Sequence, residues 1–230
     1  KTLSGLDENE MQTIIYSADT PDEIDTSVDD DSKREIGKNN VRINGVISSN
    51  DLSKMHFNHI GVKGMWLDVL GDISDPFFAM ISGKPGSGKS TFLALMSKYF
   101  ASEINSKVLY VSHEEGYSRT LQDKFERCNA FDDNTDITQS LPKNISGYDL
   151  VIIDSVSTFK LDTDDVQRLI EACRKTKTSL ALVYHATKDG QYKGMSENEH
   201  LVDMTIMIEQ GVTHVGKNRF GGKGQMNVFD

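Results

Sequence analysis

The fold is decided by the stretch Phe77-Phe78-Ala79-Met80-Ile81-Ser82-Gly83-Lys84-Pro85-Gly86-Ser87-Gly88-Lys89-Ser90. Its first five residues are an apolar run, which predicts a short buried strand. Residues 83–90 match the pattern G-x-x-x-x-G-K-[ST]. Apolar residues then recur at helical spacing as far as Ile104. A glycine-rich loop that joins a strand to a helix in this way is the context in which the pattern binds phosphate.

Each residue type in this loop suits a chain of phosphates. Glycines let backbone N–H groups turn inward around phosphate oxygens, and the helix N-terminus adds its positive end. Lys89 is expected to reach the β and γ phosphates, the Ser90 hydroxyl to bind Mg²⁺, and Thr91 to lie near the α phosphate. The sequence therefore predicts a site for ATP and Mg²⁺ whose nucleotide-binding residues are Gly83, Lys84, Pro85, Gly86, Ser87, Gly88, Lys89, Ser90 and Thr91.

Two further strands are expected to end in carboxylates. The apolar run 150–153 is followed by Asp154, which would hold Mg²⁺ through water, as a second metal-binding residue beside Ser90. The run 107–111 is followed by Ser112, His113, Glu114 and Glu115. A carboxylate there can orient a water for attack on the γ phosphate. Glu114 is the first choice for this catalytic role and Glu115 the second, and an exposed acidic pair without a role is the alternative.

Strands and helices alternate through most of the chain. The expected strands are 77–81, 107–111, 150–153 and 180–184, and the expected helices are 90–104, 117–128 and 165–175, with Asp162 or Thr163 as the cap of the last. Three more strands are expected without helices between them, at 204–209, 212–217 and 225–229, with residues 221–224 as a hairpin turn. The pattern predicts an α/β fold with a mainly parallel sheet between helices and an antiparallel extension at the C-terminus.

Charge is distributed unevenly along the 230 residues. The formal net charge is −10 at pH 7, which excludes a purely electrostatic binder of nucleic acid. Residues 1–40 hold 11 acidic and 4 basic side chains, whereas residues 41–230 hold 24 and 21. We therefore expect an acidic, flexible tail over residues 1–40 and one domain over residues 41–230.

Two isolated cysteines, Cys128 and Cys173, indicate neither a disulfide framework nor a zinc site. No apolar run approaches the roughly 18 residues of a membrane span. These two features favour a cytoplasmic protein without a membrane partner.

Four strings of residues carry a family resemblance. They are Ser112-His113-Glu114-Glu115, Tyr184-His185-Ala186-Thr187-Lys188-Asp189-Gly190, Glu199-His200-Leu201-Val202-Asp203 and Lys217-Asn218-Arg219-Phe220-Gly221. In this order, and over about residues 60–229, they resemble bacterial RadA (Sms), a RecA-family ATPase related to the DnaB-type helicases. The resemblance implies a RecA-like P-loop fold, ATP hydrolysis in a ring or filament of identical subunits, and action on single-stranded DNA.

The resemblance also implies roles for single residues. Glu114 resembles the catalytic glutamate, and His185 stands where the family has a polar sensor of the γ phosphate. Lys217 and Arg219 resemble fingers that reach the nucleotide of a neighbouring subunit, where cations stabilise the transition state. With Lys89, these four form the expected catalytic set. Residues 155–164 and 187–198 are the loops that would face DNA.

Several departures from the family keep other functions open. The zinc module and the protease-like domain of RadA are missing, which fits either a shorter relative or a part of a longer protein. The loops expected to face DNA hold few cations for phosphate contact, namely Lys160, Lys188 and Lys193 against Asp162, Asp164, Asp165, Asp189, Glu197 and Glu199. The alternatives are an ATP-switched assembly or signalling module that does not bind DNA, and a nucleotide-binding domain with little hydrolysis.

Overall fold

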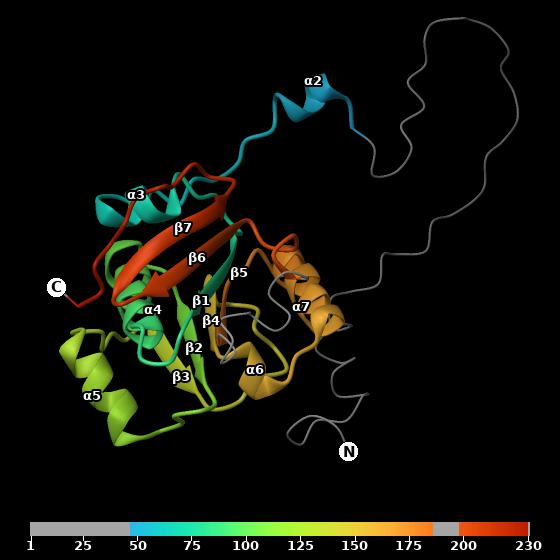
Figure 1. The fold of residues 1–230 in the computed structure, drawn as a ribbon. Helices are drawn as coiled ribbons and strands as arrows, with labels where there is room; N and C mark the ends of the chain where they lie inside the picture. The colour runs from blue at the N-terminus through green and yellow to red at the C-terminus, as the bar shows by residue number, and fades with distance from the viewer. Residues whose placement is uncertain (1–46, 186–197, 230) are drawn as a thin grey trace, which may run out of the picture. The chain divides into compact units, whose positions relative to one another are not determined.

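Seven strands form one sheet in the computed structural model, which describes residues 47–185 and 198–229. In sheet order they are β3 (Thr135–Thr138), β2 (Val108–Ser112), β4 (Leu150–Asp154), β5 (Ser179–His185), β1 (Phe78–Gly83), β6 (Met204–Glu209) and β7 (Val212–Asn218). Every neighbouring pair from β3 to β6 is parallel, and β7 runs antiparallel to β6 (Figure 1). The expected RecA-like fold, a parallel sheet with an antiparallel C-terminal hairpin, is confirmed.

Helices cover both faces of the sheet, because alternate residues of each central strand point to opposite sides. On one face, α3 (Met65–Leu70), α4 (Lys89–Lys98) and α5 (Arg119–Arg127) pack on strand residues such as Ala79 and Ile81. On the other face, α6 (Val156–Phe159) and α7 (Thr163–Thr176) pack on residues such as Phe78 and Met80. All six residues of β1 are buried, so the strand that precedes the glycine-rich loop lies in the middle of the core.

Two helix boundaries show how local sequence sets the elements. Asp162 accepts a hydrogen bond from the Asp165 backbone N–H at 2.8 Å, and the Asp165 side chain accepts one from the backbone of Asp162 at 3.2 Å. This capping box begins α7 where the sequence predicts a cap. The helix expected to continue to Ile104 leaves α geometry at Lys98 and ends in the π-helical turn η1 (Tyr99–Glu103).

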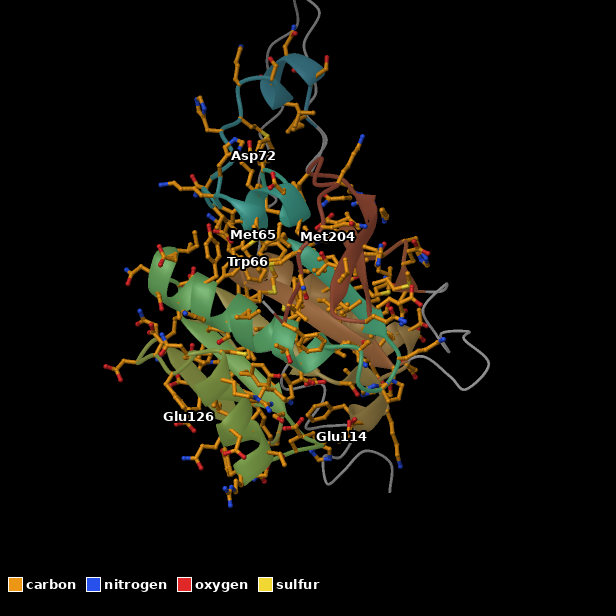
Figure 2. The ribbon with its side chains drawn as sticks, turned by 60° about the vertical axis from the view of Figure 1, so that its left-hand side comes forward. Met65, Trp66, Asp72, Glu114, Glu126 and Met204 are labelled. Carbon is orange, nitrogen blue, oxygen red and sulfur yellow. The ribbon has the colours of Figure 1, made fainter. Side chains whose placement is uncertain are left out.

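Aromatic side chains join α3 to the helix that follows the glycine-rich loop. Figure 2 labels Trp66 on α3. The centroid of its ring lies 5.4 Å from that of the Phe92 ring on α4 and 5.2 Å from that of the Tyr99 ring on η1. Trp66 is buried, and so are Phe77 and Phe78 of the apolar run from which the sequence predicts a buried strand. These contacts hold α4, and with it the glycine-rich loop, against the body of the fold.

The expected strand at residues 225–229 is wrong. Only an isolated bridge joins Val212 to Asn227, and residues 225–229 form an irregular segment that we call the C-terminal strap. Residues 221–224 are likewise no hairpin turn: the backbone N–H groups of Lys223 and Gly224 both donate to the Asp68 carbonyl of α3, at 2.9 and 2.7 Å. This docking of the glycines on α3 holds them away from the position that a hairpin would require.

Within the described part of residues 59–229, three elements were not expected from the sequence: β3, α3 and α6. The four residues of β3 are all half-buried at the sheet edge, so they carry neither a continuous apolar run nor a clear alternation. The α6 turn occupies part of the loop 155–164 that was expected to face DNA.

Other parts of the chain need separate description. Residues 47–58, which contain α2 (Ser49–Leu52), belong to a different compact unit from residues 59–229. The expected tail at residues 1–40, the start of the expected domain at residue 41, and residues 187–197 of the second expected DNA loop lie outside the described residues. Within the described ranges, no helix is both long enough and apolar enough to cross a membrane.

Candidate functional site

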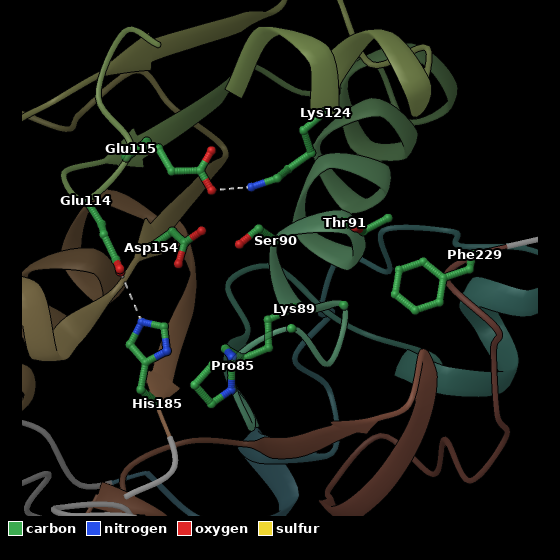
Figure 3. Close-up of a pocket in the computed structure, with 13 residues that line it drawn as sticks. Pro85, Lys89, Ser90, Thr91, Glu114, Glu115, Lys124, Asp154, His185 and Phe229 are labelled. Atoms are coloured by element: carbon green, nitrogen blue, oxygen red, sulfur yellow. Dashed lines mark hydrogen bonds and ion pairs between the residues drawn. The ribbon is translucent and has the colours of Figure 1, made fainter. Parts of the chain in front are cut away.

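A pocket of about 340 Å³ opens where four parallel strands end (Figure 3). In the sheet register, Gly83 at the end of β1 pairs with His185 at the end of β5, and Ser112 of β2 pairs with Asp154 of β4. The pocket is lined by Pro85, Gly86, Gly88, Lys89, Ser90, Thr91, Ser112, Glu114, Glu115, Lys124, Asp154, His185 and Phe229. The fold thus brings the glycine-rich loop and the expected carboxylates together at the carboxyl ends of the parallel strands.

The loop has the backbone shape that an anion site requires. Gly86 and Gly88 have φ angles of +75° and +104°, which side chains disfavour, and Gly88 is the N-cap of α4. The Lys89 ammonium group is buried and donates to the carbonyls of Gly83 and Lys84, both at 2.9 Å. Burial lowers the pKa of Lys89, and the charges of Asp154 and Glu114 act against that shift. The two carbonyl groups therefore hold the end of the Lys89 side chain beneath the loop.

Ser87 is a loop residue with an unpaired hydroxyl group. Its hydroxyl oxygen is buried and has no hydrogen-bond partner among the described residues. A Cβ atom at Gly83 would lie 2.5 Å from this oxygen, so the hydroxyl packs against the end of β1. Gly83, Lys84 and Ser87 shape the loop but do not line the pocket itself.

Asp154 and Ser90 form an oxygen donor set at the centre of the pocket. Asp154 is buried, and the Tyr110 hydroxyl donates to its Oδ2 at 3.2 Å. Burial raises the pKa of Asp154, while a hydrogen bond with Ser90 and the charge of Lys124 lower it. No group of three or more His, Cys, Asp or Glu residues within the described ranges could hold a metal. A hydroxyl and one carboxylate, completed by phosphate oxygens and water, still fit Mg²⁺.

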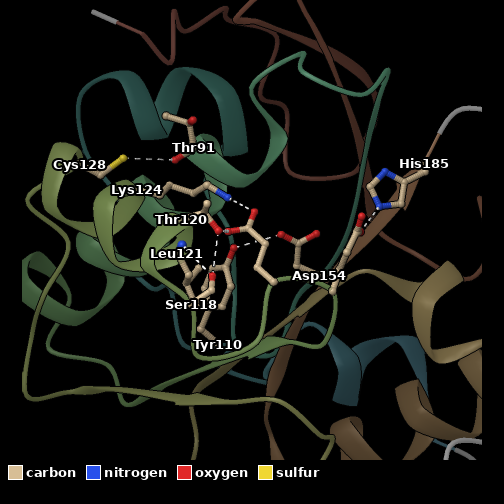
Figure 4. Close-up of polar contacts among 11 residues, drawn as sticks. Thr91, Tyr110, Ser118, Thr120, Leu121, Lys124, Cys128, Asp154 and His185 are labelled. Carbon is tan, nitrogen blue, oxygen red and sulfur yellow. Dashed lines mark hydrogen bonds and ion pairs between the residues drawn. The ribbon is translucent and has the colours of Figure 1, made fainter.

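The two neighbouring glutamates, labelled in Figure 3, have different surroundings, and Figure 4 labels Lys124, Thr120 and His185, which contact them. Glu115 forms an ion pair with Lys124 of α5, and the Thr120 hydroxyl donates to its second oxygen at 3.4 Å. Glu114 is 64% exposed, and its Oε2 lies 3.4 Å from Nε2 of His185 without forming a hydrogen bond. Glu115 is thus held by α5, whereas the Glu114 carboxylate remains available to a ligand.

Lys124 is a pocket residue that the sequence did not indicate. It lies on α5, outside every motif, and its side chain is only 12% exposed. The helix is amphipathic, and Lys124 lies one turn beyond Leu121 on its inward face, beside the buried Phe125. A lysine among apolar positions that face a predicted phosphate loop was the signal that could have identified it.

Lys217 and Arg219 do not line this pocket. Arg219 donates to Oδ1 of Asp203 at 3.0 Å, and Asp203 accepts from the backbone N–H of Phe78, at the beginning of β1. Lys217 donates to the carbonyls of Glu199 and Val202, at 2.9 and 2.6 Å. Since β1 has six residues, Arg219 lies about 17 Å along the sheet from the loop at its far end.

A family model described as an AAA domain matches residues 76–177, which include the glycine-rich loop, the two glutamates and Asp154. The chain is 32% identical over 181 residues to the DNA repair protein RadA of Rickettsia felis, a match that covers 66% of this chain and 40% of the relative. It is 26% identical over 224 residues to RadA of Campylobacter jejuni, covering 86% of this chain and 50% of the relative. The chain thus spans half or less of the length of these relatives.

A solved structure shares the fold. The KaiC-like protein PH0186 of Pyrococcus horikoshii superposes with a TM-score of 0.54 at 16% identity, covering 74% of this chain and 92% of that one. The loop, the strand order and the sequence similarity agree with one another. The chain therefore has a RecA-like P-loop fold and is similar in sequence to RadA.

Proposed function

We propose that this chain binds ATP with Mg²⁺ at the glycine-rich loop and hydrolyses it. The observation that carries the proposal is the pocket itself, which gathers a buried lysine, a hydroxyl, a buried aspartate and an exposed glutamate around an anion-binding loop. Ser90 and Asp154 would hold Mg²⁺, which supplies charge neutralisation between the phosphates. Lys89 would bind the β and γ phosphates.

Glu114 is the proposed catalytic carboxylate. It lies in the pocket, is exposed, and has no hydrogen-bonded partner that would keep it from a water molecule, whereas Glu115 is paired with Lys124. His185, beside Glu114, is the proposed sensor of the γ phosphate, because loss of that phosphate changes the charge next to its ring.

The location of Lys217 and Arg219 supports hydrolysis in an assembly. Both cations lie near the beginning of β1, at the end of the strands opposite the loop, so neither can reach the nucleotide of its own subunit. The Arg219 side chain is 54% exposed and thus accessible to another copy. We propose that both act as fingers at a neighbour's site, in a ring or filament of identical subunits.

Single-stranded DNA is the proposed partner, because the relatives include proteins named DNA repair protein RadA. One observation favours an assembly switch that does not bind DNA. In residues 155–164, the described loop expected to face DNA, Asp162 is engaged in the α7 capping box and Lys160 is the one cation. A cytoplasmic location also belongs to the proposal, since both cysteines are free and buried.

The test is the rate of ATP hydrolysis against protein concentration, with and without single-stranded DNA. Hydrolysis per subunit should rise with concentration as copies assemble, and DNA should raise it further. Glu114→Gln should lower kcat by at least about 100-fold with little change in ATP affinity. Glu115→Gln is the matched variant and should retain more activity. A hydrolysis rate that is unchanged by DNA but rises with protein concentration would favour the assembly switch. A trace rate that is unchanged by Glu114→Gln would favour a nucleotide-binding domain with little hydrolysis.

A further inference from the structure

One pocket residue has no role in phosphate or metal chemistry. Phe229 lines the pocket with a side chain that is 60% exposed, although it lies on the C-terminal strap, far along the chain from the loop. In Figure 3, Glu114 and His185 lie on one side of Ser90, and Phe229 lies on the other, beyond Thr91. A large exposed aromatic ring at that end of a nucleotide pocket calls for an explanation.

Backbone hydrogen bonds tie the strap to the glycine-rich loop. The Gly211 N–H donates to the Ser87 carbonyl at 2.9 Å, and the Val228 N–H donates to the Gly211 carbonyl at 2.7 Å. Farther along, the Thr213 N–H donates to the Met226 carbonyl at 2.9 Å, and the Met226 N–H donates to the Thr213 hydroxyl at 2.8 Å. Phe229 is therefore held next to the loop by a connected chain of bonds.

Two glycines make room for the ring. A Cβ atom at Gly211 would lie 2.3 Å from Cδ2 of Phe229, and one at Gly88 would lie 3.1 Å from its Cζ. The ring thus packs against bare backbone at the N-cap of α4 and at the β6–β7 turn. Its remaining surface stays open to the pocket and to solvent.

The polarity of the pocket says which part of a nucleotide would meet this ring. The γ phosphate belongs beside Glu114 and His185, and the α phosphate beside Thr91, so the sugar and base leave the loop on the Thr91 side. We propose that Phe229 forms the base-stacking platform of the site, with the nucleobase lying on the open face of its ring. The proposal rests on nucleotide binding at the glycine-rich loop and adds the residue that holds the nucleoside.

A stacked aromatic ring has a measurable signature, because it contributes to binding of a nucleotide but not of bare phosphates. Base–aromatic stacking is worth enough that its removal lowers affinity about tenfold. The experiment is equilibrium binding of ATP and of inorganic triphosphate, each with Mg²⁺, to the full 230-residue chain. Phe229→Ala should weaken ATP binding about tenfold and leave triphosphate binding unchanged, and Phe229→Trp should restore ATP binding.

Two controls separate this inference from the function on which it rests. Phe131→Ala removes another exposed phenylalanine that does not line the pocket, and it should change neither affinity. Lys89→Ala should weaken the binding of both ATP and triphosphate. If wild-type protein binds ATP but Phe229→Ala binds it equally well, the platform is wrong and the nucleotide site stands. If wild-type protein binds neither ligand, the nucleotide site is wrong and the platform fails with it.

Discussion

Asp154, the proposed metal-binding carboxylate, shows at the scale of one residue how burying an acid lowers the stability of the fold. Burial raises its pKa, so the ionised carboxylate is less favourable in the folded chain than in the unfolded one. Its contribution to stability is therefore fully favourable only below the unfolded pKa of about 3.9, and is lost as the pH rises through the higher folded value. At neutral pH the group is retained at the expense of stability.

We expect Asp154→Asn to raise the Tm at neutral pH, by about 2–4 °C for each kcal/mol by which the free energy of unfolding increases. The amide oxygen can still accept the Tyr110 hydrogen bond, and the amide NH₂ group can donate to the Ser90 hydroxyl oxygen. The gain should shrink as the pH falls through the raised folded pKa, and it should be gone below about pH 4, where the carboxyl is protonated in both the folded and the unfolded chain. Thermal unfolding at the two pH values measures it, with exposed Asp164→Asn as the control. A variant no more stable than wild type at neutral pH would contradict the destabilising role of the buried charge.

The C-terminal strap carries the prediction at the scale of the element. Gly211 has a φ of +82° and faces the Phe229 ring, whereas Gly147 has a φ of +97° and open space where a Cβ would lie. Alanine at either position should lower the free energy of unfolding by about 1 kcal/mol through backbone strain. Because the Phe229 ring can swing into solvent, the clash at Gly211 should displace the ring rather than unfold the chain.

Gly211→Ala should therefore weaken ATP binding several-fold, while Gly147→Ala should not, at similar losses of stability. Chemical denaturation and ATP titration on both variants measure the two quantities. Equal ATP affinities in the two variants would show that the position of the ring does not matter for binding.

Elements with a strong local signal could be predicted from the sequence. The apolar runs at β1, β2, β4 and β5 specify strands without tertiary information, and the pattern at residues 83–90 specifies a loop between a strand and a helix. Asp162 is one of the two caps that the sequence predicts for α7. The path of the strap could not be predicted, because it depends on long-range hydrogen bonds to Gly211 and Thr213. The ion pair between Glu115 and Lys124 could not be predicted from the sequence either, because only folding brings α5 over the ends of the strands.

At the scale of the whole molecule, the distance between Arg219 and the glycine-rich loop of its own subunit leads to a prediction about mixed assemblies. In an assembly with fingers in trans, Arg219→Ala and Glu114→Gln each disable hydrolysis by themselves. A mixture of the two variants should recover part of the activity, because a site that keeps Glu114 can meet a neighbour that keeps Arg219. Steady-state hydrolysis of the mixture, after the subunits have exchanged, measures this. No recovery in mixed assemblies would contradict fingers in trans.

The contact between Arg219 and Asp203 has a further consequence for such an assembly. The Asp203 carboxylate is only 12% exposed and also holds the backbone N–H of Phe78, where β1 begins its path to the subunit's own loop. When Arg219 leaves for a neighbour's nucleotide, Asp203 would lose its counter-ion while still bound to β1, which costs free energy. Nucleotide occupancy at one site would then be thermodynamically linked to strain at the base of the next, and such linkage is reciprocal, so adjacent sites would sense each other's state through a single aspartate.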